Sequence, residues 1–271
     1  MVTPAHSNEY KLLDLPGTLE KKFMETQING DDKHVTFERT FSGGAKMTER
    51  YWSRTTIPSI TYEQNYRGRK IKQSNSVTCE NRNCSESYTL EMETQEGNRR
   101  IIEEYPIAKL ILDQNDFAQF RLRTPSSRII ITDQGNDTRI FTRSGTDGEV
   151  FLIQREKGSE KDWHNYSLER YDFGLNQFFM VKSQEMQADG SQIDRLYVRN
   201  PEHVVQYKVL MKKTDDKTIL RQYFDGESER LTYQIRTTDL GEGVAETEYD
   251  HGARGTFAKK SRTERKELPL Q

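Results

Sequence analysis

Residues that favour burial recur at every second position along much of this 271-residue chain. In segment 204–211, Val205, Tyr207, Val209 and Met211 fall on one side, while polar and apolar residues mix on the other. The same alternation is found at 35–41 and 87–94. Successive side chains of a β-strand point to opposite faces of the sheet. The alternation therefore predicts strands with one buried face.

Turn residues separate these runs at short intervals. Asn29-Gly30 lies between two of the runs, and this dipeptide tolerates the positive φ that a tight β-hairpin requires. Similar Gly- and Asp-rich breaks recur along the chain, as a meander of hairpins requires. We expect strands at 22–28, 34–41, 46–55, 59–66, 70–79, 85–94, 107–112, 117–123, 127–133, 138–143, 149–155, 165–172, 177–185, 192–198, 203–212, 218–224, 230–237 and 244–249.

Helical periodicity is scarce. Residues 15–20 could form a short helix, with Thr18 as its cap, or could lead into the first strand. Residues 99–105 are a weaker helix candidate. The sequence therefore predicts a fold with little helix.

The composition is unusually polar for a chain of this length. Hydrophobic residues make up 32% and the mean hydropathy is −0.95. Thin or elongated architectures keep more surface in water than a thick spherical core does. We expect an all-β fold, an antiparallel meander of many polar hairpins that is extended or folded into a sandwich or half-barrel. Segments 46–51 and 227–230 carry charges on both faces, which argues against an outer-membrane barrel with its apolar lipid face.

The expected organisation is one main domain with two flanking segments. Residues 1–33 form an N-terminal lead-in with the first strand, and 34–252 form a single antiparallel β domain. Pro125 gives a possible sub-boundary near residue 125 within that domain. Residues 253–271 are highly charged and lack an apolar face, so we expect a flexible tail there.

Several classes of protein are disfavoured. No run approaches 18 apolar residues, which excludes a transmembrane helix, and residues 1–10 lack the apolar region of a signal peptide. A net charge of −2 gives no overall attraction for nucleic acid or anionic membranes. Basic residues at 67–72 lie near Tyr62 and Tyr66, and this combination suits single-stranded nucleic acid. Interspersed acidic residues argue against nucleic acid, and we keep the two tyrosines as candidate binding residues.

Cys79 and Cys84 are the two cysteines, and they flank a short polar loop between expected strands. Opposed strand ends bring Cα atoms within the range of a disulfide, so we expect a bond between them. The alternative is a pair of reduced surface thiols. A disulfide favours an oxidising compartment. We therefore expect the protein to lie in the periplasm, at the cell surface or outside the cell, with its signal peptide absent from the chain given.

Residues 162–166 are the richest functional cluster of the sequence. Trp163 and Tyr166 flank His164, and flat aromatic faces stack on sugars and peptides. The alternative is a strand entry with one aromatic residue in the core. The five histidines do not pair at the spacing of metal ligands, and we expect no metal and no cofactor.

Three hypotheses for function remain open. The first is a non-enzymatic β-protein outside the cytoplasm that acts as an adhesive, structural or binding module for a protein or glycan, with oligomers possible. The second is a closed or half-closed barrel that carries an apolar ligand such as a lipid, lined by Phe178, Phe179, Met180 and segment 204–211. The third is a carbohydrate- or peptidoglycan-processing enzyme with Asp162 and His164 in its site. We favour the first because motifs for nucleophilic, phosphate-binding and zinc chemistry are absent.

Overall fold

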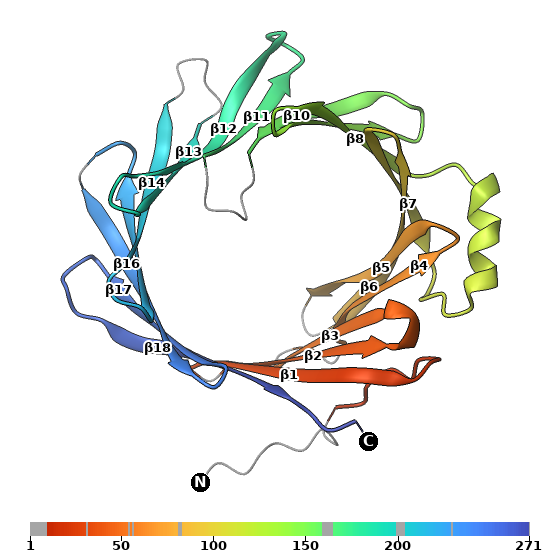
Figure 1. Ribbon diagram of the computed structural model, residues 1–271, viewed down its shortest axis with the longest axis horizontal. Helices are drawn as coiled ribbons and strands as arrows, with labels where there is room; N and C mark the ends of the chain where they lie inside the picture. The colour runs from red at the N-terminus through yellow and green to blue at the C-terminus, as the bar shows by residue number, and fades with distance from the viewer. Residues whose placement is uncertain are drawn as a thin grey trace.

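Paired strands account for almost all of the structure. The computed structural model describes residues 10–30, 32–53, 55, 57–80, 83–158, 165–198, 204–228 and 230–270. Within these residues, 18 strands form one antiparallel sheet in which each strand pairs with its neighbours in sequence. β1 also pairs with β18, so the sheet closes into a barrel (Figure 1).

The strands of the first half of the barrel are β1 (Leu19–Asn29), β2 (Asp32–Phe41), β3 (Lys46–Trp52), β4 (Ser59–Tyr66), β5 (Arg69–Glu80), β6 (Asn83–Glu96), β7 (Arg99–Ile107), β8 (Ser127–Gly135) and β9 (Thr138–Gly145). Those of the second half are β10 (Val150–Lys157), β11 (Tyr166–Asp172), β12 (Gln177–Met186), β13 (Gln192–Tyr197), β14 (Val205–Lys213), β15 (Thr218–Asp225), β16 (Leu231–Gly241), β17 (Val244–His251) and β18 (Ala258–Glu267). Two 3-10 helices are η2 (Ser42–Gly44) and η3 (Gln114–Leu122).

The expected all-β antiparallel meander with little helix is confirmed. Among the forms that the sequence left open, the chain adopts a closed barrel. The hairpin between β8 and β9 shows how local sequence directs the meander. Asn136 and Asp137 have φ angles of 50° and 56°, the positive values that suit a tight hairpin turn.

The segment between β7 and β8 differs from the expectation. Strands expected at 107–112 and 117–123 are replaced by an extended strap, residues 108–122, that ends in η3. Residues 99–105, the weaker helix candidate, instead belong to β7, and residues 15–18 lead into β1 without forming a helix. The expected sub-boundary near residue 125 lies between β7 and β8, and these two strands pair directly.

The tail expected after residue 252 is wrong for residues 258–267, which form β18. This strand pairs with both β17 and β1 and so closes the ring. The sequence of β18 alternates charged residues and lacks an apolar face, so it does not show the pattern of a half-buried strand. The charged residues suit this position because both faces of β18 reach water, and Arg265 pairs with Glu38 of β2.

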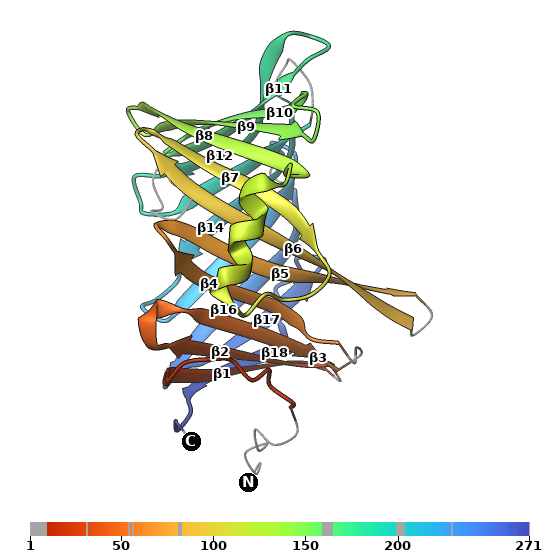
Figure 2. The ribbon, with the colours of Figure 1, turned by 90° about the vertical axis from the view of Figure 1, so that its right-hand side faces the viewer.

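The main apolar core lies on the outside of the barrel. Phe117 and Phe120 of η3 pack against outward-facing side chains of β4–β7, as Figure 2 shows for the helix lying across the outer surface. These outward-facing residues are Tyr66, Ile71, Leu90, Met92 and Tyr105. The strap thus shields one outer face of the barrel, because an unaided polar barrel has few apolar residues to bury.

A second outer core lies beneath residues 10–18. Leu15 packs with Phe41, Met47, Ile60 and Tyr62 on the outer faces of β2–β4. A neighbouring cluster joins Met24, Val35 and Phe37 to the partly buried Tyr10 and Leu12. The N-terminal segment therefore covers β1–β4 as the strap covers β4–β7.

The expected disulfide between Cys79 and Cys84 is present, and its Cα atoms are 4.0 Å apart. It joins the ends of β5 and β6 in a hairpin that projects beyond the barrel (Figure 2). Across the described residues, no helix is long and apolar enough to cross a membrane.

Candidate functional site

The outer cores identify which side chains face the lumen. Paired residues on neighbouring antiparallel strands share a face. Leu90 faces outward and pairs with Tyr105, so their sequence neighbours face the lumen. Following the registers from β7 through β13 places Val209 of β14 on the lumenal face. Following them from β1 through β18 in the other direction gives the same result.

The lumenal face of the first half of the barrel carries a row of ion pairs. These pairs are Arg143–Glu104 (2.6 Å), Arg139–Glu156 (3.1 Å), Lys72–Glu91 (3.3 Å), Arg100–Glu93 (3.7 Å) and Lys70–Glu63 (4.0 Å). The cationic side chains remain 37–53% exposed although they point inward. Side chains that filled a barrel interior would be close to fully buried. Water therefore reaches the lumen, and the charged side chains of this wall pair with one another.

The lumenal face of β14–β17 carries aromatic rings instead. Tyr223 and Tyr233 pair across β15 and β16, and their rings stack with centroids 4.1 Å apart and planes 9° apart. Tyr249 of β17 lies parallel to His251, with centroids 6.0 Å apart. Tyr207 of β14 lies on the same face. We name Tyr207, Tyr223, Tyr233, Tyr249 and His251 the tyrosine wall.

Tyr233 presents its hydroxyl group to the lumen. Partial burial raises the pKa of Tyr233 above its ordinary value, and the neighbouring Tyr223 adds to this effect. The phenol of Tyr233 therefore keeps its proton at neutral pH. A neutral phenol can both donate and accept a hydrogen bond, and its ring face remains available for stacking.

Arg221 lies beside the tyrosine wall on the lumenal face of β15. It pairs in register with Met211 of β14 and Ile235 of β16, and Tyr223 follows two residues later on the same face. In the described part of the chain, Arg221 has no hydrogen-bond or ion-pair partner. The adjacent outward-facing Arg236, by contrast, pairs with Glu248 at 2.7 Å. An unpaired guanidinium beside aromatic faces gives this wall the means to hold an anionic ligand.

The candidate residues chosen from sequence lie in different places. Trp163 and His164, together with Asp162, lie outside the described residues. Tyr166 begins β11, is buried, and pairs in register with Gln184 on the lumenal face. The side chains of Tyr62 and Tyr66 are buried in the outer cores, away from the lumen.

Sequence reasoning missed most of the tyrosine wall. It placed Tyr207 on one face with Val209 and Met211, which the registers confirm. The sequence offered one signal for the other tyrosines of the wall. Each lies at an alternating position of an expected strand, as Tyr223, Tyr233 and Tyr249 show. The pairing of strands, which brings the rings together, is not visible in the alternation of a single strand.

The described residues contain no group of three or more His, Cys, Asp or Glu side chains suited to hold a metal ion. Comparison of the chain with protein-family models, curated proteins and solved structures finds no match.

Proposed function

We propose that this protein is a non-catalytic binding protein outside the cytoplasm, and that its barrel lumen holds a glycan segment against the tyrosine wall. The observation that carries the proposal is the stacked pair Tyr223–Tyr233 with Tyr249 beside it, on the face of β15–β17 that points into a wet lumen. Sugar rings offer one apolar face and a rim of hydroxyl groups. Tyrosine rings match both, since they stack on the face and hydrogen-bond to the rim.

The charge of the wall favours an acidic glycan. Arg221 is unpaired among the described residues, whereas the cations on the opposite wall are held by carboxylates. A carboxylate of a uronic acid can accept two parallel hydrogen bonds from a guanidinium. The ligand class is therefore a saccharide chain that carries carboxylates.

The polar lining distinguishes this proposal from a lipid carrier. An apolar ligand needs a continuous apolar inner face, but charged pairs such as Arg139–Glu156 line the lumen of the first half. Phe178, suggested for such a cavity, faces outward, where Arg155 lies 4.4 Å from its ring centroid. The extracytoplasmic location rests on the Cys79–Cys84 disulfide, since such bonds persist in oxidising compartments.

Removing one ring of the stack tests the proposal. We expect Tyr223→Ala to weaken binding of tetragalacturonate and of neutral cellotetraose by about tenfold, because each loses a stacking face. Isothermal titration calorimetry measures both affinities. The matched control is Tyr171→Ala, which removes an outward-facing tyrosine that packs on Phe178 with centroids 5.1 Å apart. Absence of binding by the unaltered protein, or equal weakening in both variants, contradicts the proposal.

Arg221→Gln separates charge from stacking. The variant keeps a side chain of similar length but loses the charge, so binding of tetragalacturonate should weaken about tenfold or more while binding of cellotetraose stays unchanged. Arg99→Gln is the control, since Arg99 pairs in register with Thr132 on the outer face. Equal weakening for both saccharides would show that Arg221 supports the fold of the wall and does not recognise the acid.

A further inference from the structure

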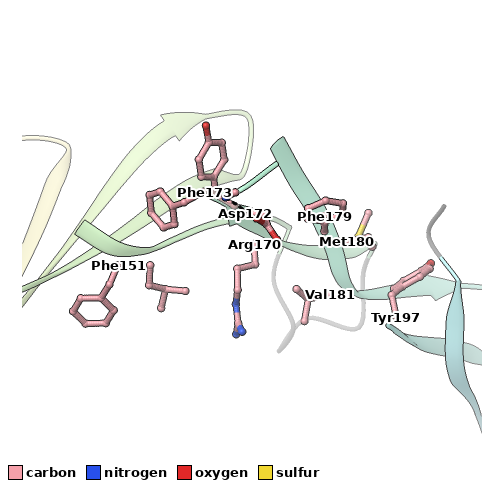
Figure 3. Close-up of a pocket in the computed structure, with 11 residues that line it drawn as sticks. Phe151, Arg170, Asp172, Phe173, Phe179, Met180, Val181 and Tyr197 are labelled. Carbon is pink, nitrogen blue, oxygen red and sulfur yellow. Dashed lines mark hydrogen bonds between the residues drawn. The ribbon is translucent and has the colours of Figure 1, made fainter. Parts of the chain in front are cut away.

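A pocket at the β10–β13 side of the barrel has a character different from that of the tyrosine wall. Its volume is about 380 Å³, within the roughly 300–1,000 Å³ range of small-molecule sites. Apolar and aromatic side chains form most of its lining, among them Phe151, Leu152, Phe179, Val181 and Tyr197 (Figure 3). Phe179 is 4% exposed and forms the buried part of the lining, whereas Phe151 is 56% exposed.

One positive charge enters this pocket. Arg170 of β11 pairs in register with Phe179 of β12 and, on its other side, with Gln154 of β10. Figure 3 shows its side chain extending from the strand on the same side as Val181. The guanidinium has no hydrogen-bond or ion-pair partner within the described ranges.

The lining also contains one carboxylate, that of Asp172. Asp172 is buried at the end of β11, and its Oδ1 accepts hydrogen bonds from the backbone N–H groups of Gly174 (2.9 Å) and Leu175 (3.1 Å). Those bonds hold the β11–β12 turn in place. Arg155 of the neighbouring strand β10 points to the outer face, where it forms an ion pair with Glu169. Arg170 is therefore the one cation among the described residues that line this pocket.

We propose that this pocket binds an aliphatic monocarboxylate, with Arg170 holding the carboxylate and the apolar wall holding the chain. A guanidinium presents two parallel N–H groups that match the two oxygens of a carboxylate. The apolar wall of Leu152, Phe179 and Val181 then removes the hydrocarbon tail from water, which supplies most of the affinity. This site is separate from the tyrosine wall and does not depend on its function.

The probe for this site is decanoate, used below its micelle-forming concentration, with affinity measured by isothermal titration calorimetry. We expect Arg170→Gln to weaken decanoate binding at least tenfold, because the charge-assisted pair is lost. Neutral decanol should bind the two proteins equally. The control Arg99→Gln removes an outward-facing arginine and should bind decanoate as the unaltered protein does.

Three results would overturn the proposal: no binding of decanoate by the unaltered protein, equal binding by Arg170→Gln, or equal loss in Arg99→Gln. Acetate tests the role of the apolar wall and should bind far more weakly than decanoate. Acetate binding as tight as that of decanoate would show a plain anion site. Binding of tetragalacturonate by Arg170→Gln, at the affinity of the unaltered protein, would show that the tyrosine wall remains intact.

Discussion

Replacing Glu49 by alanine should lower the free energy of unfolding by about 3–5 kcal/mol, because removing one partner of a buried ion pair leaves the other charge buried and unpaired. The Glu49 side chain is 0% exposed, and its Oε2 accepts a hydrogen bond from Arg39 Nη2 at 2.6 Å. Its Oε1 accepts another from the backbone N–H of Leu13 at 2.9 Å. Arg39 also donates to the Leu13 carbonyl at 2.7 Å. The pair therefore fastens the N-terminal segment to β2 and β3.

Urea denaturation followed by circular dichroism measures this loss. The control is Glu248→Ala, which removes a partly exposed partner of Arg236 and should cost less than about 1 kcal/mol. The double variant Arg39→Met/Glu49→Leu should recover much of the lost stability, because an apolar pair leaves no buried charge unpaired. A loss below about 1 kcal/mol in Glu49→Ala would show that the pair does not hold the segment.

Phe117→Ala should cost a similar amount, about 3–5 kcal/mol, because it opens a cavity in the outer core. Phe117 is 0% exposed and lies against Tyr66, with ring centroids 5.5 Å apart. The strap that it anchors covers Ile71, Leu90 and Met92, which would otherwise face water. Loss of the ring thus weakens the attachment of the whole strap.

The matched control lies in the same helix. Leu122 is 95% exposed, so Leu122→Ala should change stability by less than about 0.5 kcal/mol. Urea unfolding gives the overall loss, and hydrogen exchange shows whether β4–β7 lose protection together with the strap. Equal stability of the two variants would contradict the assignment of the main core to the outer surface.

The alternation of residues predicted most of the strands because one face of each is more buried than the other. It failed where both faces are half-buried. In β7, Ile101 pairs with Ile130 on the outer face and Ile102 with Ile129 on the lumenal face, so no alternation is visible. In η3, Phe117 and Phe120 are three residues apart, which places them on one side of a 3-10 helix.

The closed form and the site depend on pairings between distant segments. Closure rests on β18, whose charged residues pair with β1 more than two hundred residues away, as in Arg265 with Glu25. Sequence alternation also leaves open which face points into the barrel. Only the position of the strap and the N-terminal segment shows that Leu90 faces outward and the tyrosine wall inward.

Titration of protein carrying 13C-labelled tyrosine rings with tetragalacturonate tests the central claim most directly, because it reports on each of the 13 tyrosines separately. Single Tyr→Phe variants assign the resonances. The account predicts that ring signals of Tyr207, Tyr223, Tyr233 and Tyr249 shift, while those of the outward-facing Tyr62, Tyr66, Tyr105 and Tyr171 do not. Shifts confined to the outward-facing tyrosines, or no shifts at all, would contradict a glycan site in the lumen.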